Sequence, residues 1–265
     1  MDGQRRDSCM TKREEMLKNA YVERDVSWMY FNHRILQEAR KVDVPLLERF
    51  SFLGIYSNNL DEFFRVRVAS LNRMLEGAPS RETEKRIRKT LKTVVDLNEV
   101  YAREYTAAVD EVFRALETHR IRLLSEHDLN AEQKAFLTQF FQDKLNGSVN
   151  PIWLDKIKDL SVLEDNRIYL VVEMVKKKEG VSVPERACGK VRHAVVKVPD
   201  RVCGRWIQVP ASEGFTNIMY LDDVIRHCLP LVFLGFKGQY DYRAYSFKFT
   251  KDAEMEIDSD ADFSP

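Results

Sequence analysis

An amphipathic helical pattern runs without a break from Ser80 or Arg81 toward His119. Its apolar positions recur at the spacing of one helix face: Ile87, Leu91, Val94, Val95, Leu97, Tyr101, Tyr105, Val109, Val112, Phe113 and Leu116. A helix of this length buries such a face against other helices. The sequence therefore predicts an N-terminal helical bundle for residues up to about 120.

Two shorter helical patterns precede the long one. The first follows Ser27, an N-cap candidate, and Trp28 and Phe31 are predicted to be core residues. The second begins after Pro45, a residue that the first turn of a helix accepts. Its Gly54 predicts a close approach of two helices.

The stretch 55–68 interrupts the second pattern with three polar residues, the last of which is Asn59. Asn59 is a good N-cap, and Glu62 stands three residues later, as in a capping box. A new helix is therefore predicted to begin at Leu60, which makes a helix-loop-helix corner. Free backbone N–H groups at such a corner can hold a polar ligand, but the pattern alone favours simple capping.

Beyond Ile121 the pattern shifts from helical to alternating. A helix is predicted from Asn130 or Ala131 to Asn146, and a short helix from Asp222 to Leu229. Three segments rich in β-branched and aromatic residues are predicted strands: 168–175, 191–198 and 242–249. Residues 121–265 therefore predict an α+β domain with an antiparallel or mixed sheet, and the fold class is α+β multidomain.

Composition narrows the function classes. Charged residues make up 32% of the 265 residues and balance to a net charge of zero, so no global field points to nucleic acid. The local exception is the stretch 81–92, with six basic side chains. The first twenty residues are predicted to be frayed or weakly helical, and without a signal peptide or a membrane span the chain is predicted to be cytoplasmic. Scattered cysteines predict reduced thiols and no metal site: Cys9, Cys188, Cys203 and Cys228.

Motifs for several common chemistries are missing. The sequence has no phosphate-binding loop, no dinucleotide fingerprint, no zinc-protease motif and no nucleophile elbow. Asp61 and Glu62 are adjacent, so on a helix they point about 100° apart and cannot form a facing acid–base pair. Each histidine is better explained as a surface or satisfied core residue than as a nucleophile: His33, His119, His127, His193 and His227.

Three blocks of sequence take the interpretation further. The segments 23–39, 44–49 and 52–67, the last containing Ser-Asn-Asn-Leu-Asp-Glu, resemble the N-terminal signature of bacterial polyphosphate kinase of the long, histidine-phosphorylating type. The segment 245–254 resembles the end of that family's second, or head, domain. Asp25 and Val26 stand where the family usually has Glu and Leu, a mild departure.

The resemblance implies a Mg²⁺-dependent, reversible transfer of the ATP γ-phosphate through a phosphohistidine to polyphosphate. In the family, the second Asn of the quoted block contacts ATP, which corresponds to Asn59 here, and an amide suits the edge of adenine. Arg65 and Arg67 are predicted either to face the phosphate or polyphosphate path or to be ion-paired on the helix surface. The head domain implies assembly into a homodimer or tetramer, with ATP, ADP and polyphosphate as ligands.

The family's catalytic histidines and the expected Mg²⁺ ligands lie in domains beyond residue 265. The resemblance thus predicts that this chain is the N-terminal and head portion, that its end looks like a cut, and that it is inactive alone. Two alternatives stay open: a non-catalytic assembly module, and a polyanion-binding helical domain that uses the stretch 81–92. A reading frame that continues into two H-x-K-containing domains would favour the kinase.

Overall fold

The computed structural model describes residues 21–177, 191–211 and 214–251. The chain divides into two compact units, residues 1–112 and 113–265. The predicted leader at 1–20 lies outside the described residues, as do Cys9, Cys188 and the chain end that looks like a cut.

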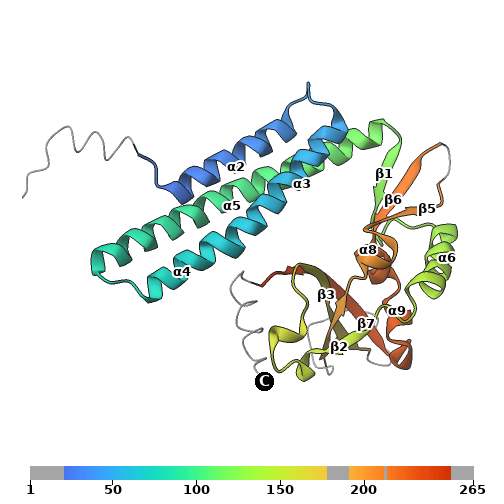
Figure 1. Ribbon diagram of the computed structural model, residues 1–265. Coiled ribbons are helices and arrows are strands. Elements are labelled where there is room, and N and C mark those ends of the chain that lie inside the picture. The colour runs from blue at the N-terminus through green and yellow to red at the C-terminus, as the bar shows by residue number, and fades with distance from the viewer. Residues whose placement is uncertain (1–20, 178–190, 212–213, 252–265) are drawn as a thin grey trace, which may run out of the picture. The chain divides into compact units, whose positions relative to one another are not determined.

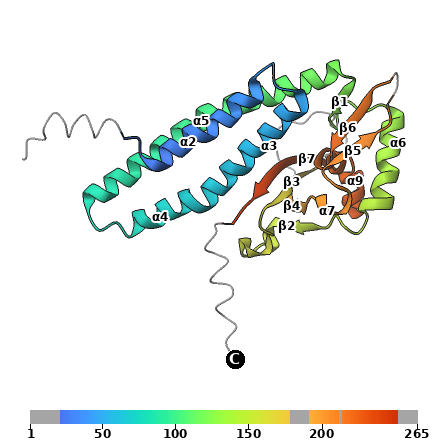
Figure 2. The ribbon, with the colours of Figure 1, turned by 45° about the horizontal axis from the view of Figure 1, so that its top comes forward.

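The helical unit contains three long helices that run alongside one another (Figures 1 and 2). Its elements are α2 (Arg24–Arg40), α3 (Leu46–Glu62), a π-helical segment (Phe63–Val68), α4 (Ala69–Glu76) and most of α5 (Arg81–Thr118). Apolar residues from every helix are buried between them: Met29, Leu36, Leu53, Phe63, Leu71, Ile87, Val94, Ala108 and Val112. The predicted bundle and its long helix are confirmed.

The predicted corner at 57–59 is wrong, because the helix passes straight through it. α3 continues to Glu62, and the backbone N–H of Phe63 bonds to the carbonyl oxygens of Asn59 and Leu60. Asn59 is therefore no N-cap, Leu60 starts no helix, and Glu62 completes no capping box. Helical hydrogen bonding continues into the π-helical segment and then α4, which ends at Gly77.

Three details of the first helices also differ from expectation. α2 begins at Arg24, before Ser27, because the Glu23 carboxylate accepts hydrogen bonds from the backbone N–H groups at its start. Phe31 is 59% exposed rather than buried. Gly54 is exposed and a Cβ there would meet no atom within 4 Å, so no close helix approach explains it.

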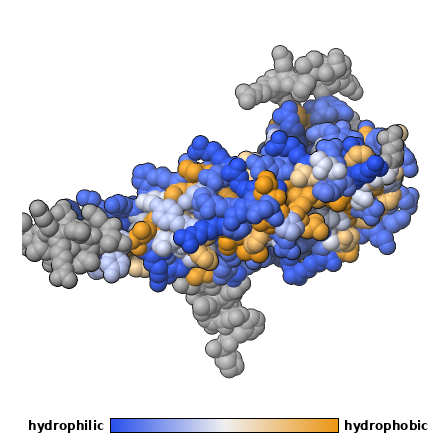
Figure 3. Space-filling model, turned by 90° about the horizontal axis from the view of Figure 1, so that it is seen from above, coloured by the Kyte–Doolittle hydropathy of each residue, from blue (hydrophilic) through white to orange (hydrophobic). Residues whose placement is uncertain are grey.

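Figure 3 shows that one face of the molecule is mostly hydrophilic and carries patches of hydrophobic residues.

The α+β unit confirms the predicted fold class. Its helices are α6 (Ala131–Phe140), a π-helical turn (Phe141–Leu145), α7 (Asp200–Cys203), α8 (Leu221–His227) and α9 (Leu229–Val232). Short 3₁₀ turns lie at Leu154–Lys156, Leu160–Val162 and Leu234–Phe236. Its strands are β1 (Ile121–Leu124), β2 (Pro151–Trp153), β3 (Arg167–Lys176), β4 (Val191–Lys197), β5 (Trp206–Val209), β6 (Thr216–Tyr220) and β7 (Tyr240–Phe249).

Two sheets organise the strands. One is antiparallel with the order β2-β4-β3-β7, so that Val171 of β3 lies between Val195 of β4 and Tyr245 of β7. The other has the order β1-β6-β5 and is mixed, because β1 runs parallel to β6 while β5 is antiparallel to it. The three long strands were predicted, whereas β1, β2, β5 and β6, of three to five residues, were not.

The start of α6 shows what a capping box looks like in this chain. Asn130 accepts a hydrogen bond from the backbone N–H of Gln133, and the Gln133 side chain accepts one from the backbone N–H of Asn130. The chain turns at Gly147, where φ is +87°, a conformation that glycine adopts without steric strain. The predicted start and end of this helical segment are confirmed.

Candidate functional site

Asn59 lies on the last turn of α3, where it is half-buried. Its side-chain Nδ2 donates a hydrogen bond to Oδ1 of Asn32 on α2, with 3.2 Å between the atoms. Asn32 is 1% exposed, and its own Nδ2 donates to the backbone carbonyl of Tyr56 at 3.2 Å. Two amides therefore join α2 to α3, and a tertiary contact rather than a cap orients the Asn59 side chain.

A layer of tyrosines packs beside this amide pair. Tyr56 of α3 is buried and stacks on Tyr105 of α5 with ring centroids 5.4 Å apart. Burial raises the pKa of Tyr56 to about 12 and also raises the pKa of Tyr105, although a hydrogen bond with Ser57 opposes the shift at Tyr105. Because both phenols stay protonated near neutral pH, Tyr56 acts here as a packing group, and Tyr105 acts as a packing and hydrogen-bonding group.

His33 is engaged between α2 and α5. Its Nε2 lies 2.8 Å from a carboxylate oxygen of Glu104, and its ring stacks on Tyr101 at a centroid distance of 3.9 Å. Both the face and one edge of the imidazole are therefore occupied by its own helical unit. That no histidine of this chain is catalytic stays a prediction.

The π-helical segment carries both arginines that were candidates for a phosphate path. Arg67 forms a bidentate ion pair with Asp25, at 2.8 Å from Nε and 3.0 Å from Nη2, and Asp25 is 3% exposed. Hydrogen bonding to Asp25 raises the pKa of the Arg67 guanidinium. Arg67 thus ties the segment to the start of α2, while Arg65 lies half-buried on the same segment. A phosphate contact by either stays a prediction.

The basic stretch at the start of α5 is partly neutralised along its own helix. Arg88 pairs with Glu84 at 2.9 Å, and Lys92 pairs with Asp96 at 2.8 Å, each one helical turn apart. These pairs are exposed and separated by four residues, the ordinary arrangement of a solvated helix face. The geometry gives the polyanion-binding alternative no support beyond its composition.

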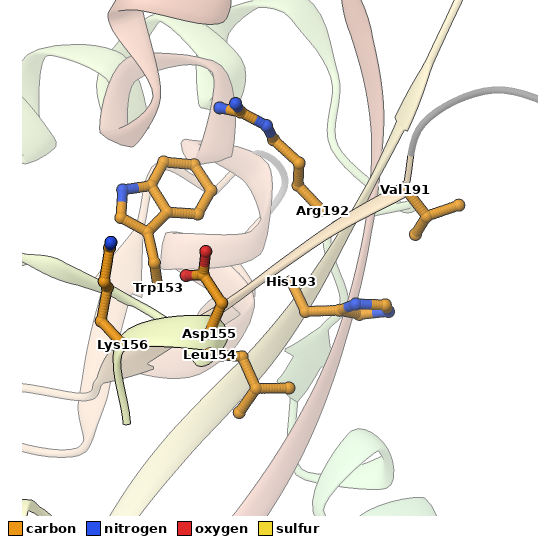
Figure 4. Close-up of a pocket in the computed structure, with 7 residues that line it drawn as sticks. All are labelled: Trp153, Leu154, Asp155, Lys156, Val191, Arg192 and His193. Atoms are coloured by element: carbon orange, nitrogen blue, oxygen red, sulfur yellow. The ribbon is translucent and has the colours of Figure 1, made fainter. Parts of the chain in front are cut away.

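The α+β unit has a surface pocket of about 660 Å³ beside β2 and β4. Figure 4 shows Arg192 extending toward the Trp153 ring, while His193 points to the other side of β4. The Arg192 guanidinium lies 5.3 Å from the ring centroid, a cation–π distance. All lining residues except Trp153 are exposed, so the pocket lacks the buried polar groups that a specific ligand site uses.

Charged side chains meet inside the α+β unit at α8. Arg226 contacts Asp223 and Ser246 and donates from Nε to the carbonyl oxygen of Ala244 at 3.2 Å. Ser246 in turn donates to Asp222 at 2.6 Å. Burial raises the pKa of Asp223 to about 6, against the opposing pull of Arg226. These contacts fasten α8 to β7.

No three His, Cys, Asp or Glu side chains within the described ranges lie together in a way that could hold a metal ion. The described residues therefore do not fit a resident Mg²⁺ site. A search of the same residues finds no helix long and apolar enough to cross a bilayer.

Two partners of the candidate residues were missed from the sequence. Asn32 interrupts the apolar stripe that Met29 and Leu36 continue, and a buried amide in such a stripe signals a specific partner. Asp25 stands near a helix start, where a carboxylate is ordinary, so its pairing with Arg67, 42 residues away, left no local signal.

Comparison with known proteins follows this geometry. Two family models match the chain: the polyphosphate kinase N-terminal domain over residues 21–124 and the polyphosphate kinase middle domain over residues 132–264. The polyphosphate kinase of Vibrio parahaemolyticus is 34% identical over 251 residues, which cover 92% of this chain and 34% of that protein. The polyphosphate kinase of Escherichia coli K12 is 32% identical over 240 residues, which cover 89% and 33%.

A solved structure agrees with these matches. The crystal structure of polyphosphate kinase from Porphyromonas gingivalis superposes with a TM-score of 0.70 at 30% sequence identity. The superposed region covers 89% of this chain and 34% of the solved chain. The present chain spans about a third of the length of the curated relatives that it matches.

Proposed function

The chain belongs to the polyphosphate kinase family, and from this membership we propose that the protein reversibly transfers the γ-phosphate of ATP to inorganic polyphosphate. The proposal concerns the whole protein, because the chain spans about a third of its relatives' length. A cytoplasmic location and a requirement for Mg²⁺ with ATP belong to the same proposal.

The proposed chemistry proceeds in two displacements. A histidine nitrogen outside this chain attacks the γ-phosphorus of ATP, the bond to the bridging oxygen breaks, and ADP leaves. A terminal oxygen of polyphosphate then attacks the same phosphorus, forming a new phosphoanhydride and releasing the imidazole. Positioning of the nucleotide is the contribution expected from the present chain, since phosphoryl transfer depends mainly on positioning and charge stabilisation.

Asn59 is the proposed nucleotide contact, through its amide and the edge of adenine. The observation that carries this assignment is the hydrogen bond that Nδ2 of Asn59 donates to Oδ1 of Asn32 at 3.2 Å. An amide held by a neighbour on a rigid helix loses little freedom when a ligand binds, which favours affinity. Oδ1, the other polar atom of the Asn59 side chain, is the group available to a ligand.

The test uses the full-length enzyme. We expect Asn59→Ala to raise the KM for ATP by roughly 2- to 10-fold, because one hydrogen bond contributes about 0.5–1.5 kcal/mol. Asn58→Ala is the matched control, because Asn58 is the exposed neighbouring amide on α3. Steady-state kinetics at saturating polyphosphate provide the measurement. Equal KM values in the two variants would contradict the adenine contact.

The 265-residue chain alone is expected to be inactive. None of its histidines matches the family's catalytic motif, so incubation with Mg-ATP should leave no acid-labile phosphate on it. Mass spectrometry of histidine-containing peptides checks this expectation. A phosphohistidine on any of the five would move the proposed chemistry into this chain.

The α+β unit is the proposed dimerisation surface. Several of its apolar side chains are exposed, among them Leu160 at 60% and Val162 at 50%. Exposed apolar side chains that gather in one region are typical of contacts between proteins. Light scattering over a range of concentrations should give the mass of a dimer for this chain, and a constant monomer mass would exclude the surface.

A further inference from the structure

The amide pair between α2 and α3 has a fixed direction. A backbone carbonyl only accepts hydrogen bonds, so the carbonyl oxygen of Tyr56 must face the NH₂ group of Asn32. The oxygen of the Asn32 amide is then the atom that faces Asn59, at 3.2 Å from Nδ2. Asn59 must therefore turn its own NH₂ toward Asn32.

These two hydrogen bonds also determine which atom of Asn59 can contact a ligand. The two polar atoms of a planar amide lie on different branches, so binding Nδ2 to Asn32 leaves Oδ1 directed elsewhere. In the part of the chain that the structure describes, Asn32 is the hydrogen-bond partner of the Asn59 side chain. The group that Asn59 offers is therefore an acceptor.

An acceptor distinguishes the two purines. Adenine carries an amino donor on the ring edge where guanine carries the O6 acceptor. A freely rotating asparagine would serve both, because a half-turn of its amide exchanges donor and acceptor. A half-turn of Asn59 here would place two oxygens against each other, and a matching turn of Asn32 would oppose its oxygen to the Tyr56 carbonyl inside the helix pair.

We propose that Asn32 is a positioning residue that holds Asn59 with its oxygen toward the nucleotide base, and that it thereby favours adenine over guanine nucleotides. This inference rests on the proposed adenine contact of Asn59. Asn32 itself is 1% exposed and lies on α2, so it acts through Asn59 and not by touching the base.

The experiment compares ATP with GTP in the full-length enzyme. Asn32→Leu removes both hydrogen bonds with little change of volume, and Asn32→Ser substitutes a rotatable hydroxyl that has no fixed direction. We expect the ratio of kcat/KM for ATP to that for GTP to fall about tenfold in either variant, mainly through a higher KM for ATP. Asn32→Ser decides the outcome if Asn32→Leu does not fold.

Melting temperatures and the exposed-amide control Asn58→Ala complete the design. A purely structural role of Asn32 would lower the melting temperature and change both nucleotides equally, leaving the ratio intact. An unchanged ratio would therefore overturn the inference. If Asn59→Ala raises the KM for ATP while the Asn32 variants keep the ratio, only the positioning role fails, whereas an unaffected Asn59→Ala would remove the adenine contact itself.

Discussion

The helical unit joins α2 to α3 with two neutral amides, whereas the α+β unit fastens α8 to β7 with two carboxylates, a guanidinium and a hydroxyl. The amide pair is a chain with a free end, because Asn59 has a polar atom left after Asn32 is satisfied. The charged cluster is closed by its own neighbours: Arg226 pairs with Asp223, Ser246 donates to one oxygen of Asp222, and Arg205 lies 3.1 Å from the other.

The difference shows which buried polar contacts can serve a ligand. A buried charge must be neutralised by its neighbours, since desolvation of an unpaired ion is far more costly than that of an amide. The charged cluster at α8 therefore stabilises the fold of the α+β unit. A neutral amide can leave one atom for a ligand at modest cost, which makes the α2–α3 contact the better place for recognition.

Among the substitutions that test this difference between the two units, the largest effect on stability is expected at Arg226. Arg226→Met keeps the length of the side chain but leaves Asp223 without its ion-pair partner and Asp222 with Arg205 as its remaining cation, and we expect a loss of about 3–5 kcal/mol in the free energy of unfolding. The control Arg243→Met removes an exposed arginine 4.0 Å from Glu173 and should cost no more than about 1 kcal/mol. Urea unfolding of the 265-residue chain measures both. Equal losses would refute the closed cluster.

Arg67 tests whether the helical unit also depends on a charged contact. Arg67→Met removes both hydrogen bonds from the buried carboxylate of Asp25, and we expect a loss of about 2–3 kcal/mol. Arg103→Met is the control, since Arg103 bonds only to the backbone of its own helix among the described residues. An unchanged melting temperature in Arg67→Met would show that the ion pair with Asp25 does not stabilise the fold, and a ligand-binding role for Arg67 would then be favoured.

The raised pKa of Asp223 makes the stability of the α+β unit depend on pH. Its pKa is raised from 3.8 to about 6 in the fold, so its contribution to stability is fully present below pH 3.8 and is lost as the pH rises through 6. Between pH 4 and 7 this loss amounts to about 2 kcal/mol. Asp223→Asn should therefore gain stability relative to the parent as the pH rises, in a series of melting temperatures.

The control for that series is Asp241→Asn, which removes a carboxylate that is 70% exposed and pairs with Lys177. It should follow the parent curve at every pH. A parallel course of Asp223→Asn and the parent would show that this carboxylate has its ordinary pKa in the fold.

The smallest expected effect comes from two glycines, one in each unit. Gly54 is exposed inside α3 with nothing near an added Cβ, so Gly54→Ala should stabilise the chain by about 0.5–1 kcal/mol. Gly147 adopts a φ of +87°, so Gly147→Ala should destabilise it by about 1 kcal/mol. Changes of the same sign in both melting temperatures would contradict this contrast.

Local patterns predicted most of the architecture. The spacing of apolar residues defined α5 to within a residue at each end, and segments rich in β-branched and aromatic residues predicted β3, β4 and β7. The helix start at Asn130 or Ala131 was also predicted, whereas the capping box there, which joins residues only three apart, was not. The short strands β1, β2, β5 and β6 were missed, since three to five residues carry too little periodicity to be distinguished from a loop.

Asn59 marks the boundary of what the sequence by itself determined. The same residue type that caps α6 at Asn130 was predicted to cap a helix at Asn59, and the local pattern does not separate the two cases. The sequence determined an asparagine in a helical stretch and, through its neighbours, the family. Only the tertiary structure decided that α3 continues past it and that its Nδ2 donates to Asn32, because a contact between residues 27 apart leaves no trace in the local pattern.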